Sequence, residues 1–213
     1  MANRKRCDFC YPDKETRSRI LKQTKNFFIL SDIGPIVPGH LLLIPKKHIP
    51  CLATMDKNLE KKFLALKDKI TFFSTLYYGF PLIFEHGITG QTIFHAHLHF
   101  IPTPDRLLFN PPTLKKVLEK IKTFDANISI RKIKSLEAVK RSWQKRSKYL
   151  YLEENSEKYL VYGQEVPPRF LRDVIAEILG VPERGNWREV TDGQEILKKV
   201  KKNWIEFPKI KSP

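Results

Sequence analysis

The sequence is poor in cysteine and has no long apolar run. The first shortage argues against a disulfide-rich secreted domain, and the second argues against a membrane-spanning protein. The chain contains three cysteines among 213 residues, too few for the disulfide framework of a small secreted domain. No stretch approaches the roughly 20 apolar residues that a membrane-spanning helix needs. The first ten residues, MANRKRCDFC, lack the apolar segment of a secretory signal. We therefore expect a cytoplasmic protein with reduced cysteines and no membrane partner.

Acidic residues are also in short supply, and the resulting charge favours anionic partners. There are 23 Asp and Glu residues against 39 Lys and Arg residues, which gives a formal net charge of +16. Such a balance indicates nucleotides, nucleic acid or acidic surfaces as partners. The excess of positive charge is strongest between Lys115 and Lys148. A lysine-rich surface that is only solvated would have the same composition, so charge alone leaves nucleic-acid binding open.

Hydrophobic patterning divides the chain into a core over residues 1–105 and a basic C-terminal extension over residues 106–213 that packs on it. The length suffices for one sizeable core with an appendage. Apolar residues recur at three- and four-residue steps across residues 57–78, which predicts a long helix. Short apolar runs and turn residues predict strands at 27–33, 40–44, 81–85, 94–101, 148–152 and 158–162. Further helices are expected at 112–122, after Pro168, and at 193–206.

Three histidines occupy alternating positions of one apolar run, FHAHLHFIP. In a β-strand side chains alternate between two faces, so His95, His97 and His99 would share one face. Imidazoles this close must be mostly neutral, which a metal, a phosphate-bearing ligand or a hydrogen-bond network would achieve. All six histidines lie between positions 40 and 99, and this clustering indicates a single site. The alternative is a solvated strand face that happens to use histidine.

Cys7 and Cys10 form a C-x-x-C pair, which has the spacing of a metal clamp. Two cysteines so spaced bind one metal from a tight turn, and imidazoles complete a tetrahedral zinc site. His48 and His95 are the best candidates for the other two ligands, and Cys51 is not expected to contribute. A redox pair is a rival interpretation, although its strand-then-helix context is missing. Two reduced cysteines without a metal are another.

The run HAHLHFI, residues 95–101, resembles the signature of the histidine triad (HIT) superfamily of nucleotide hydrolases and transferases. The upstream run NFFILSDIGPIVPGHLLLIPKKHI is similar to the other segment that this family shares, and the predicted long helix lies between the two. The resemblance covers residues 5–103. It implies an α+β fold with a HIT-like, mostly antiparallel sheet and a long helix packed on one side. The C-terminal extension adds further helices and strands.

The resemblance also implies a catalytic mechanism. His97 would attack the α-phosphate of a nucleotide and form a nucleotidyl-histidine intermediate, because neutral imidazole is both a good nucleophile and a good leaving group. Water or another acceptor would then release the nucleotide. His99 matches the position that contacts phosphate and aids the leaving group, and His40 matches a histidine near the nucleophile.

Further positions match ligands of the nucleotide and of a metal in the family. Asp32 matches a carboxylate that binds ribose hydroxyls, with a role as a turn residue as the alternative. Gln91 and Thr92 match a polar pair ahead of the triad, and the hydroxyl of Thr92 can donate to a phosphate oxygen. His95 matches a ligand that many zinc-containing members use, which supports a structural zinc on the four Cys and His candidates.

Two departures from the family pattern bear on the substrate. Where many members have Asn or Gln, this chain has Glu85, and a carboxylate near polyphosphate would be unfavourable unless it served a metal, a hydroxyl or an amine. A structural role of Glu85 is the alternative. The second departure is the extension, in which PPRFLRDVIAEILGVPERGNWRE more weakly resembles the C-terminal part of CwfJ-type HIT relatives, which are associated with RNA processing. Arg169, Arg172, Arg184 and Arg188 would contact substrate phosphates there, or would be surface arginines around a packed helix.

These observations predict a nucleotide phosphohydrolase or nucleotidyl transferase that acts at the α-phosphate. Dinucleoside polyphosphates and nucleotide conjugates are the expected substrates, and zinc is the expected structural cofactor. The basic extension suggests nucleic acid as a further partner, and a homodimer is a further expectation. The alternative function is an RNA- or DNA-binding adaptor that uses a HIT fold with little catalytic activity.

Overall fold

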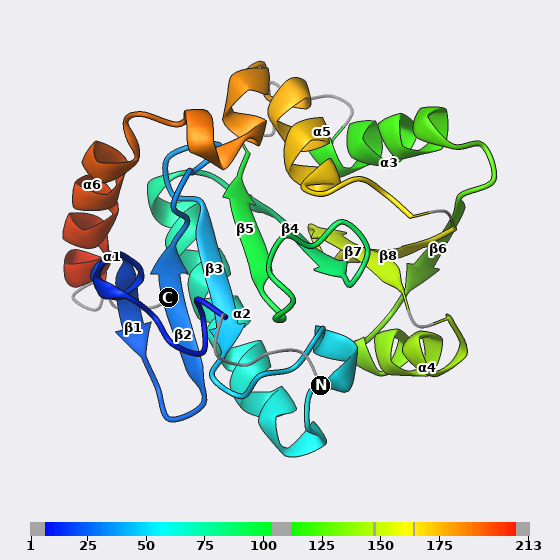
Figure 1. The fold of residues 1–213 in the computed structure, drawn as a ribbon, viewed down its shortest axis with the longest axis horizontal. Helices are drawn as coiled ribbons and strands as arrows, with labels where there is room; N and C mark the ends of the chain where they lie inside the picture. The colour runs from blue at the N-terminus through cyan, green and yellow to red at the C-terminus, as the bar shows by residue number, and fades with distance from the viewer. Residues whose placement is uncertain (1–6, 104–111, 147, 164, 208–213) are drawn as a thin grey trace.

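The computed structural model describes residues 7–103, 112–146, 148–163 and 165–207, and the statements below concern these residues. They form an α+β fold around one sheet of eight antiparallel strands in the order β1-β2-β3-β5-β4-β7-β8-β6 (Figure 1). The predicted α+β class with an antiparallel sheet is confirmed. The boundary predicted between residues 105 and 106 falls outside the described residues and stays a prediction.

Strands come from both halves of the sequence. They are β1 (Ile20–Gln23), β2 (Phe27–Ser31), β3 (Leu41–Pro45), β4 (Pro81–Gly87), β5 (Leu98–Pro102), β6 (Ser129–Ile133), β7 (Tyr149–Glu154) and β8 (Glu157–Tyr162). Sequence patterning predicts all of these except β1 and β6. Those two strands lie at the sheet edges and bury few side chains, so they lack a clear apolar alternation.

Six α-helices and several short 3₁₀ turns complete the described fold. The helices are α1 (Lys14–Ser18), α2 (Glu60–Tyr77), α3 (Thr113–Phe124), α4 (Leu136–Arg146), α5 (Phe170–Ile178) and α6 (Gly193–Glu206). The 3₁₀ turns are η2 (Leu52–Thr54), η3 (Lys57–Leu59), η4 (Pro182–Gly185) and η5 (Trp187–Glu189). The sequence predicts neither α1 nor α4. None of the described helices combines the length and the apolarity that crossing a bilayer requires.

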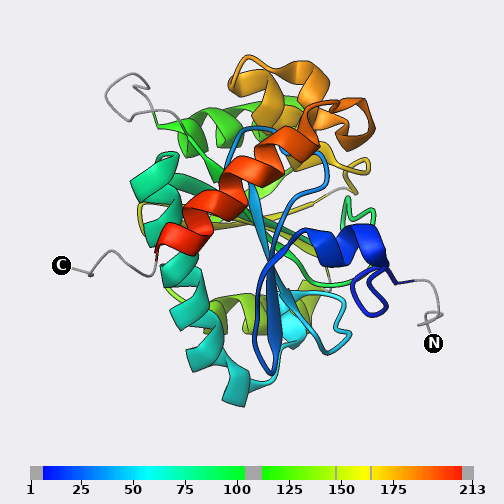
Figure 2. The same cartoon turned by 90° about the vertical axis from the view of Figure 1, so that its left-hand side faces the viewer.

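The helices cover the two faces of the sheet unequally. On one face, α2, α4 and α6 contribute to a common hydrophobic core, and Figure 2 shows α6 crossing α2. Phe73 of α2 and Trp204 of α6 meet there edge to face, with ring centroids 4.8 Å apart. On the other face, α3 and α5 pack mainly over β4, β7 and β8. Part of this second face, at β3 and β5, lies under a pocket.

The C-terminal half extends the sheet itself. Strand β7 pairs with β4 from Ile83 opposite Glu153 to Gly87 opposite Tyr149. β7 then turns into β8 through two residues with positive φ, Asn155 and Ser156, as a tight hairpin requires. The two halves of the chain therefore share one backbone hydrogen-bond network.

The histidine run is less regular than its alternation predicts. Strand β5 begins at Leu98, so only His99 lies within the strand, and the prediction of one strand carrying all three histidines is wrong. The physical reason is a change of backbone partner. The amide of Ala96 donates to the carbonyl of Ile49, 2.8 Å away, in place of a ladder bond to β3.

Glu85 is fully buried in β4 and does not line the pocket. Its Oε1 accepts the amide of Leu52 (2.7 Å), and its Oε2 accepts the hydroxyl of Tyr149 (2.6 Å). Burial raises the pKa of this carboxyl to about 7. The side chain thus fastens β4 to β7 and to the loop before α2. It has the structural role that the sequence left open.

We expect Glu85→Gln to remove a pH dependence of stability. Because the folded-state pKa of Glu85, about 7, lies above its ordinary value of 4.5, the folded protein keeps a proton that the unfolded chain releases. The wild-type free energy of unfolding should therefore fall between pH 4.5 and pH 7, by up to about 3 kcal/mol from this group. Glutamine does not ionise; its oxygen can still accept the amide of Leu52, while its NH₂ group can donate to the hydroxyl of Tyr149. Urea unfolding of both proteins at pH 5 and pH 8 measures the difference, and an identical pH dependence would contradict the assignment.

Candidate functional site

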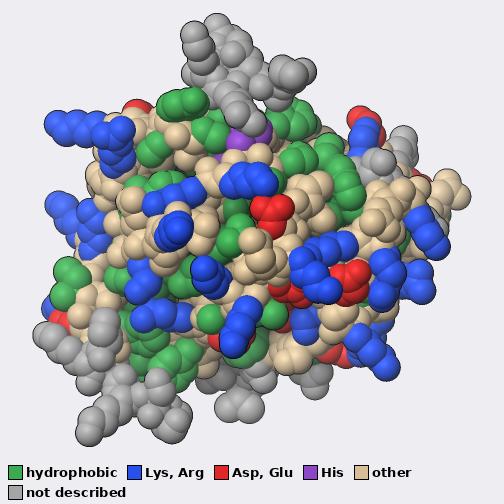
Figure 3. Space-filling model, turned by 90° about the horizontal axis from the view of Figure 1, so that it is seen from below, with side chains coloured by type: hydrophobic (Ala, Val, Ile, Leu, Met, Phe, Trp, Pro, Cys, Tyr) green, Lys and Arg blue, Asp and Glu red, His purple; other side chains and the backbone are tan. Residues whose placement is uncertain are grey.

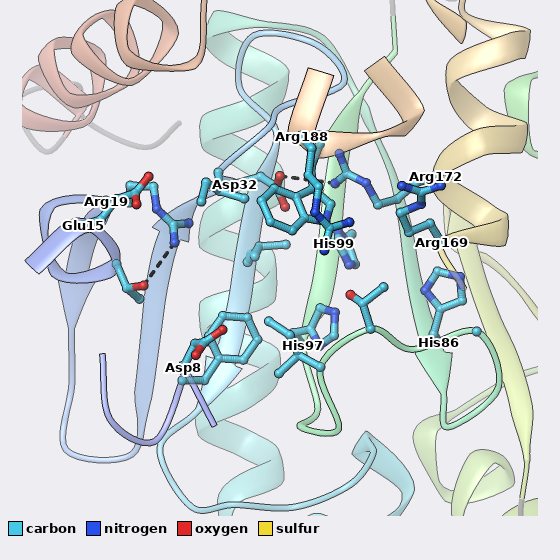
Figure 4. A pocket seen from close by; sticks show the side chains of 18 of the residues that line it. Asp8, Glu15, Arg19, Asp32, His86, His97, His99, Arg169, Arg172 and Arg188 are labelled. Carbon is cyan, nitrogen blue, oxygen red and sulfur yellow. Dashed lines mark hydrogen bonds and ion pairs between the residues drawn. The ribbon is translucent and has the colours of Figure 1, made fainter. Parts of the chain in front are cut away.

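A pocket of about 420 Å³ opens over β3 and β5, between the N-terminal and C-terminal segments (Figure 4). His97 and His99 lie between its two walls. Leu42 of β3 also lines the pocket. The walls carry different charges: Asp8, Asp13 and Glu15, with Arg19 among them, lie on the N-terminal side, and Arg169, Arg172 and Arg188 lie on the C-terminal side. A substrate with an uneven charge distribution would be oriented by such walls.

His97 has one ring nitrogen fixed by the backbone. Its Nδ1 lies 2.6 Å from the carbonyl oxygen of His95, and because this oxygen can only accept, Nδ1 carries the proton. Burial lowers the pKa of His97, so the ring is neutral at pH 7. The ring of Phe9 packs edge to face against the imidazole, with centroids 5.4 Å apart. Nε2 is left with a lone pair, as a nucleophile requires.

His40 and His99 form a proton-ordered chain beside His97. The amide of Ile36 donates to Nδ1 of His40 (3.3 Å), so His40 carries its proton on Nε2. That Nε2 donates to Nδ1 of His99, 3.0 Å away, which leaves the proton of His99 on its own Nε2. Burial lowers the pKa of His40 to about 3 and holds that of His99 well below its usual value, so both rings are neutral. His99 therefore offers an N–H donor where His97 offers a lone pair.

Asp32 lines the pocket but is already bonded within the protein. Its Oδ1 accepts the amide of Gly34 (2.9 Å) and lies 3.2 Å from Nη1 of Arg172. Its Oδ2 lies 3.9 Å from Nε2 of His40. Burial acts to raise the pKa of Asp32, but the charge of Arg172 and the hydrogen bond from Gly34 act in the opposite direction, and the pKa lies below its ordinary value. The carboxylate is therefore ionised, and its contact with a ribose stays a prediction.

The structure separates the polar pair that precedes the triad. Thr92 lines the pocket, as its predicted role requires. The side chain of Gln91 is buried elsewhere, where its Nε2 donates to the carbonyl of Pro50 (2.9 Å). A nucleotide contact by Gln91 would require this hydrogen bond to break.

Arg172 and Arg184 are engaged with the protein rather than free for a ligand. Nε of Arg172 donates to the carbonyl of Gly185 (3.2 Å), and its Nη2 donates to the carbonyl of Gly34 (2.5 Å). Arg184 lies outside the pocket lining and makes a two-pronged ion pair with Asp192 (2.9 and 3.2 Å). Both arginines hold the C-terminal segment in place.

Arg169 and Arg188 are better placed to meet a ligand. Arg169 is the residue immediately before α5 and has a φ of 68°, a left-handed conformation that is rare for arginine. Its Nη1 donates to Asn186 (2.6 Å), and its buried Nε has no partner among the described residues. The guanidinium of the exposed Arg188 stacks over Trp187, 4.3 Å from the ring centroid. Both side chains line the pocket.

Several pocket residues escape sequence reasoning. His86 lines the pocket, where its Nε2 accepts the amide of Leu171 (3.2 Å) and burial lowers its pKa to about 3. Its membership of the histidine cluster is the signal that could have identified it. Phe9 and Trp187 also line the pocket, but neither belongs to a recognisable spacing.

Cys7, Cys10, His48 and His95 converge as predicted, with their potential ligand atoms within 4.8 Å of one another. Sγ of Cys10 lies 3.1 Å from Nδ1 of His48, and Sγ of Cys7 lies 3.4 Å from Nδ1 of His95. Donors placed at Zn–N and Zn–S bond lengths around a tetrahedral ion are about 3.3–3.8 Å apart. Nε2 of His95 donates to the carbonyl of Pro45 (2.7 Å), which frees Nδ1 to face the cysteines. The cluster can hold a metal ion.

Cys51 lies apart from this cluster, as the sequence predicts. It is fully buried in the hydrophobic core that contains α2, and burial raises the pKa of its thiol to about 12. Such a thiol stays protonated at neutral pH and is a poor metal ligand.

Comparison with known proteins identifies relatives of the first half of the chain. The profile of the HIT domain family matches residues 13–105. An uncharacterized HIT-like protein from Borreliella burgdorferi is 33% identical, over 45% of this chain and 74% of its own length. Protein HitA from Neisseria gonorrhoeae is 34% identical, over 46% of this chain and 96% of its own length.

Two other similar proteins cover different shares of this chain, one almost all of it and one about half. Zinc finger CCCH domain-containing protein 64 from Arabidopsis thaliana is 26% identical over 97% of this chain, which spans 36% of that protein's length. The solved structure of a zinc-bound histidine triad family protein from Mycobacterium smegmatis is 27% identical, with a TM-score of 0.41 over 50% of this chain and 83% of that one.

We expect Arg172→Met to destabilise the fold by about 3–5 kcal/mol, because it leaves the carboxylate of Asp32 buried without its cation. The double variant Arg172→Met/Asp32→Asn should recover part of this loss. Arg188→Met, at an exposed position of the same pocket, should change stability by less than about 0.5 kcal/mol. Urea unfolding measures all three, and equal effects of the two single variants would contradict the central role of Arg172.

Proposed function

The chain belongs to the histidine triad (HIT) domain family, and on this premise we propose that it is a nucleotide phosphohydrolase or nucleotidyl transferase acting at the α-phosphate. The observation that carries the proposal is the hydrogen bond from Nδ1 of His97 to the carbonyl of His95. It fixes the tautomer of His97 and keeps the Nε2 lone pair available for attack.

In the first step, Nε2 of His97 forms a bond to the α-phosphorus, and the bond from phosphorus to the leaving oxygen breaks. The departing oxygen leaves as an anion, and the N–H on Nε2 of His99, which the hydrogen bond from His40 orients, donates a hydrogen bond to it. The ring of His97 becomes positively charged while phosphorylated, and the carbonyl of His95 stabilises the N–H on its other nitrogen. The product is a nucleotidyl-histidine.

In the second step, water attacks the same phosphorus, and its surplus proton passes to the solvent or to the anion released in the first step. The phosphorus–nitrogen bond breaks, so His97 returns to its starting tautomer, while His99 keeps its proton on Nε2 throughout. Another acceptor hydroxyl in place of water makes the reaction a transfer. In both steps the N–H on Nε2 of His99 acts as a hydrogen-bond donor to an oxygen at the reacting phosphorus.

The pocket suits a nucleotide conjugate or a dinucleoside polyphosphate. Its volume of about 420 Å³ lies in the range of small-molecule sites. Arg169 and Arg188 provide donors for phosphate oxygens, while Asp8 and Glu15 on the opposite wall suit hydroxyls or an amine. We therefore assign the phosphates to the C-terminal wall and the nucleoside to the N-terminal wall.

Zinc is the metal that the Cys₂His₂ cluster suits, and its role in the proposal is structural. Four protein ligands close the coordination shell. The C-x-x-C turn between the two cysteines carries Asp8 and Phe9 into the pocket wall. A bound zinc ion would therefore cross-link this wall to His95.

A second function, a nucleic-acid-binding adaptor with little turnover, is favoured by the excess of basic residues in the C-terminal half. Turnover of a nucleotide conjugate that disappears with His97 supports the enzyme. Tight, salt-sensitive binding of oligonucleotides without turnover supports the adaptor. A homodimer and a cytoplasmic location stay predictions.

We expect His97→Ala to lose turnover of a dinucleoside polyphosphate or an adenosine phosphoramidate by at least about a thousandfold, because no other group replaces the nucleophile. The loss should appear in kcat, with the melting temperature little changed. His97→Gly should regain activity when imidazole is added. A near-normal rate in the alanine variant would refute the assignment of His97.

We expect one zinc ion per chain, measured by elemental analysis of protein purified without a metal-affinity step. The double variant Cys7→Ser/Cys10→Ser should lose the zinc and melt at a lower temperature, because the binding energy of a closed site contributes to folding. Cys51→Ala serves as the matched control and should keep the zinc. Zinc-free wild-type protein, together with an unchanged melting temperature of the double variant, would overturn this proposal.

A further inference from the structure

A second hollow, of about 470 Å³, lies between edge strand β6 and helix α4. We call it the β6–α4 groove. None of the described residues that line this groove also lines the pocket that contains His97 and His99. Its basic lining consists of Arg131, Lys132, Lys134, Arg141 and Lys145. No Asp or Glu is part of the described lining.

Most of these cations lack an acidic partner. Lys132 pairs with Glu157 on the neighbouring strand. Within the described part of the chain, Arg131, Lys134, Arg141 and Lys145 form no ion pair with a carboxylate. Positive charges gathered in a concave surface reinforce one another's field, so the groove attracts anions. Figure 3 views the molecule from the side where α4 lies in Figure 1, and it shows Lys and Arg side chains spread over that face.

The groove also carries hydroxyl groups suited to phosphate. Ser129, Ser135 and Ser142 line it together with Tyr162, whose hydroxyl donates to Oγ of Ser142. Hydroxyl, guanidinium and ammonium donors are the groups that contact phosphate oxygens in nucleic-acid complexes. Arginine adds a planar fork that can bind a phosphate through two hydrogen bonds.

The geometry favours a single strand over a duplex or a membrane. Cations lie on both sides of the groove, with Arg131 and Lys134 on or beside β6, and Arg141 and Lys145 one turn apart on α4. A helix that enters the major groove of a duplex reads it from a protruding face, whereas these residues of α4 line a hollow. Membrane surfaces bind flat or amphipathic faces that expose large apolar side chains, which this lining lacks.

We propose that the β6–α4 groove binds the phosphate backbone of a single-stranded nucleic acid. This binding is separate from the proposed reaction, since the groove contributes nothing to the catalytic pocket. The proposal concerns a surface that binds a nucleic-acid strand, and it does not depend on which nucleotide the pocket accepts.

The test uses the full chain and a fluorescent twelve-nucleotide oligouridine. A groove variant replaces four cations by glutamine: Arg131→Gln, Lys134→Gln, Arg141→Gln and Lys145→Gln. All four side chains are exposed, so folding should be preserved. A matched control removes the same charge elsewhere through Lys61→Gln, Lys62→Gln, Lys198→Gln and Lys202→Gln, which are exposed on α2 and α6.

Fluorescence anisotropy between 50 and 200 mM salt should show at least about tenfold weaker binding by the groove variant at 100 mM. Its salt slope, the change of log K with log salt, should be smaller by about 0.7 for each phosphate that the variant no longer neutralises. The control should bind within about twofold of wild type. Equally weakened binding by the two variants would overturn the proposal, because it would show a diffuse charge effect.

Two further probes test whether the groove prefers a nucleic-acid duplex or a membrane surface to a single strand. A duplex of equal length or vesicles of phosphatidylserine and phosphatidylcholine that bind more tightly than the oligouridine would also overturn the proposal. Turnover of a dinucleoside polyphosphate should be the same in the groove variant and in wild type. Oligouridine binding is measured independently of turnover, so failure of the proposed reaction and failure of the groove proposal are distinguishable.

Discussion

The ion pair between Arg172 and Asp32 holds the two walls of the pocket against each other. Both side chains are buried, and the remaining donors of Arg172 bond to the carbonyls of Gly34 and Gly185, so one guanidinium joins α5, η4 and the connection after β2. Gly34 permits this closeness, since a Cβ there would lie 2.4 Å from the carbonyl oxygen of Trp187. The pocket is thus built by both halves of the chain, although the HIT domain profile matches only the first.

His95 connects the metal cluster to the chemistry proposed for the pocket. Its side chain faces the two cysteines, while its carbonyl oxygen accepts the hydrogen bond that Nδ1 of His97 donates. Because the ring and the carbonyl belong to one residue, a metal that fixed the ring of His95 would also restrict the orientation of its carbonyl. A structural metal at this place would therefore act on the tautomer of the nucleophile without touching the substrate, as a partner outside the reacting groups often does for a catalytic histidine.

Much of the first half could be predicted from the sequence, because its signals are local. The apolar stripe of α2, the C-x-x-C pair and the alternating histidines each report on neighbours a few residues away. The role of Arg172 could not be predicted, since a charged residue in an amphipathic helix is normally solvent-exposed and its partner lies far along the chain. The orientation of Gln91 depends likewise on the backbone of Pro50. The short edge strands β1 and β6 gave no periodic signal, because they are stabilised by pairing rather than by burial.

The order of the sheet also limits how copies of this chain can associate. Strand β4 has β5 on one side and β7 on the other, so its backbone is not available to a second molecule. In the described sheet the outer strands are β1 and β6. β1 is four residues long with a register irregularity, and β6 carries Arg131 and Lys132 along its length, two features that discourage strand addition. These features favour self-association through side-chain surfaces over a sheet that continues from one molecule into the next.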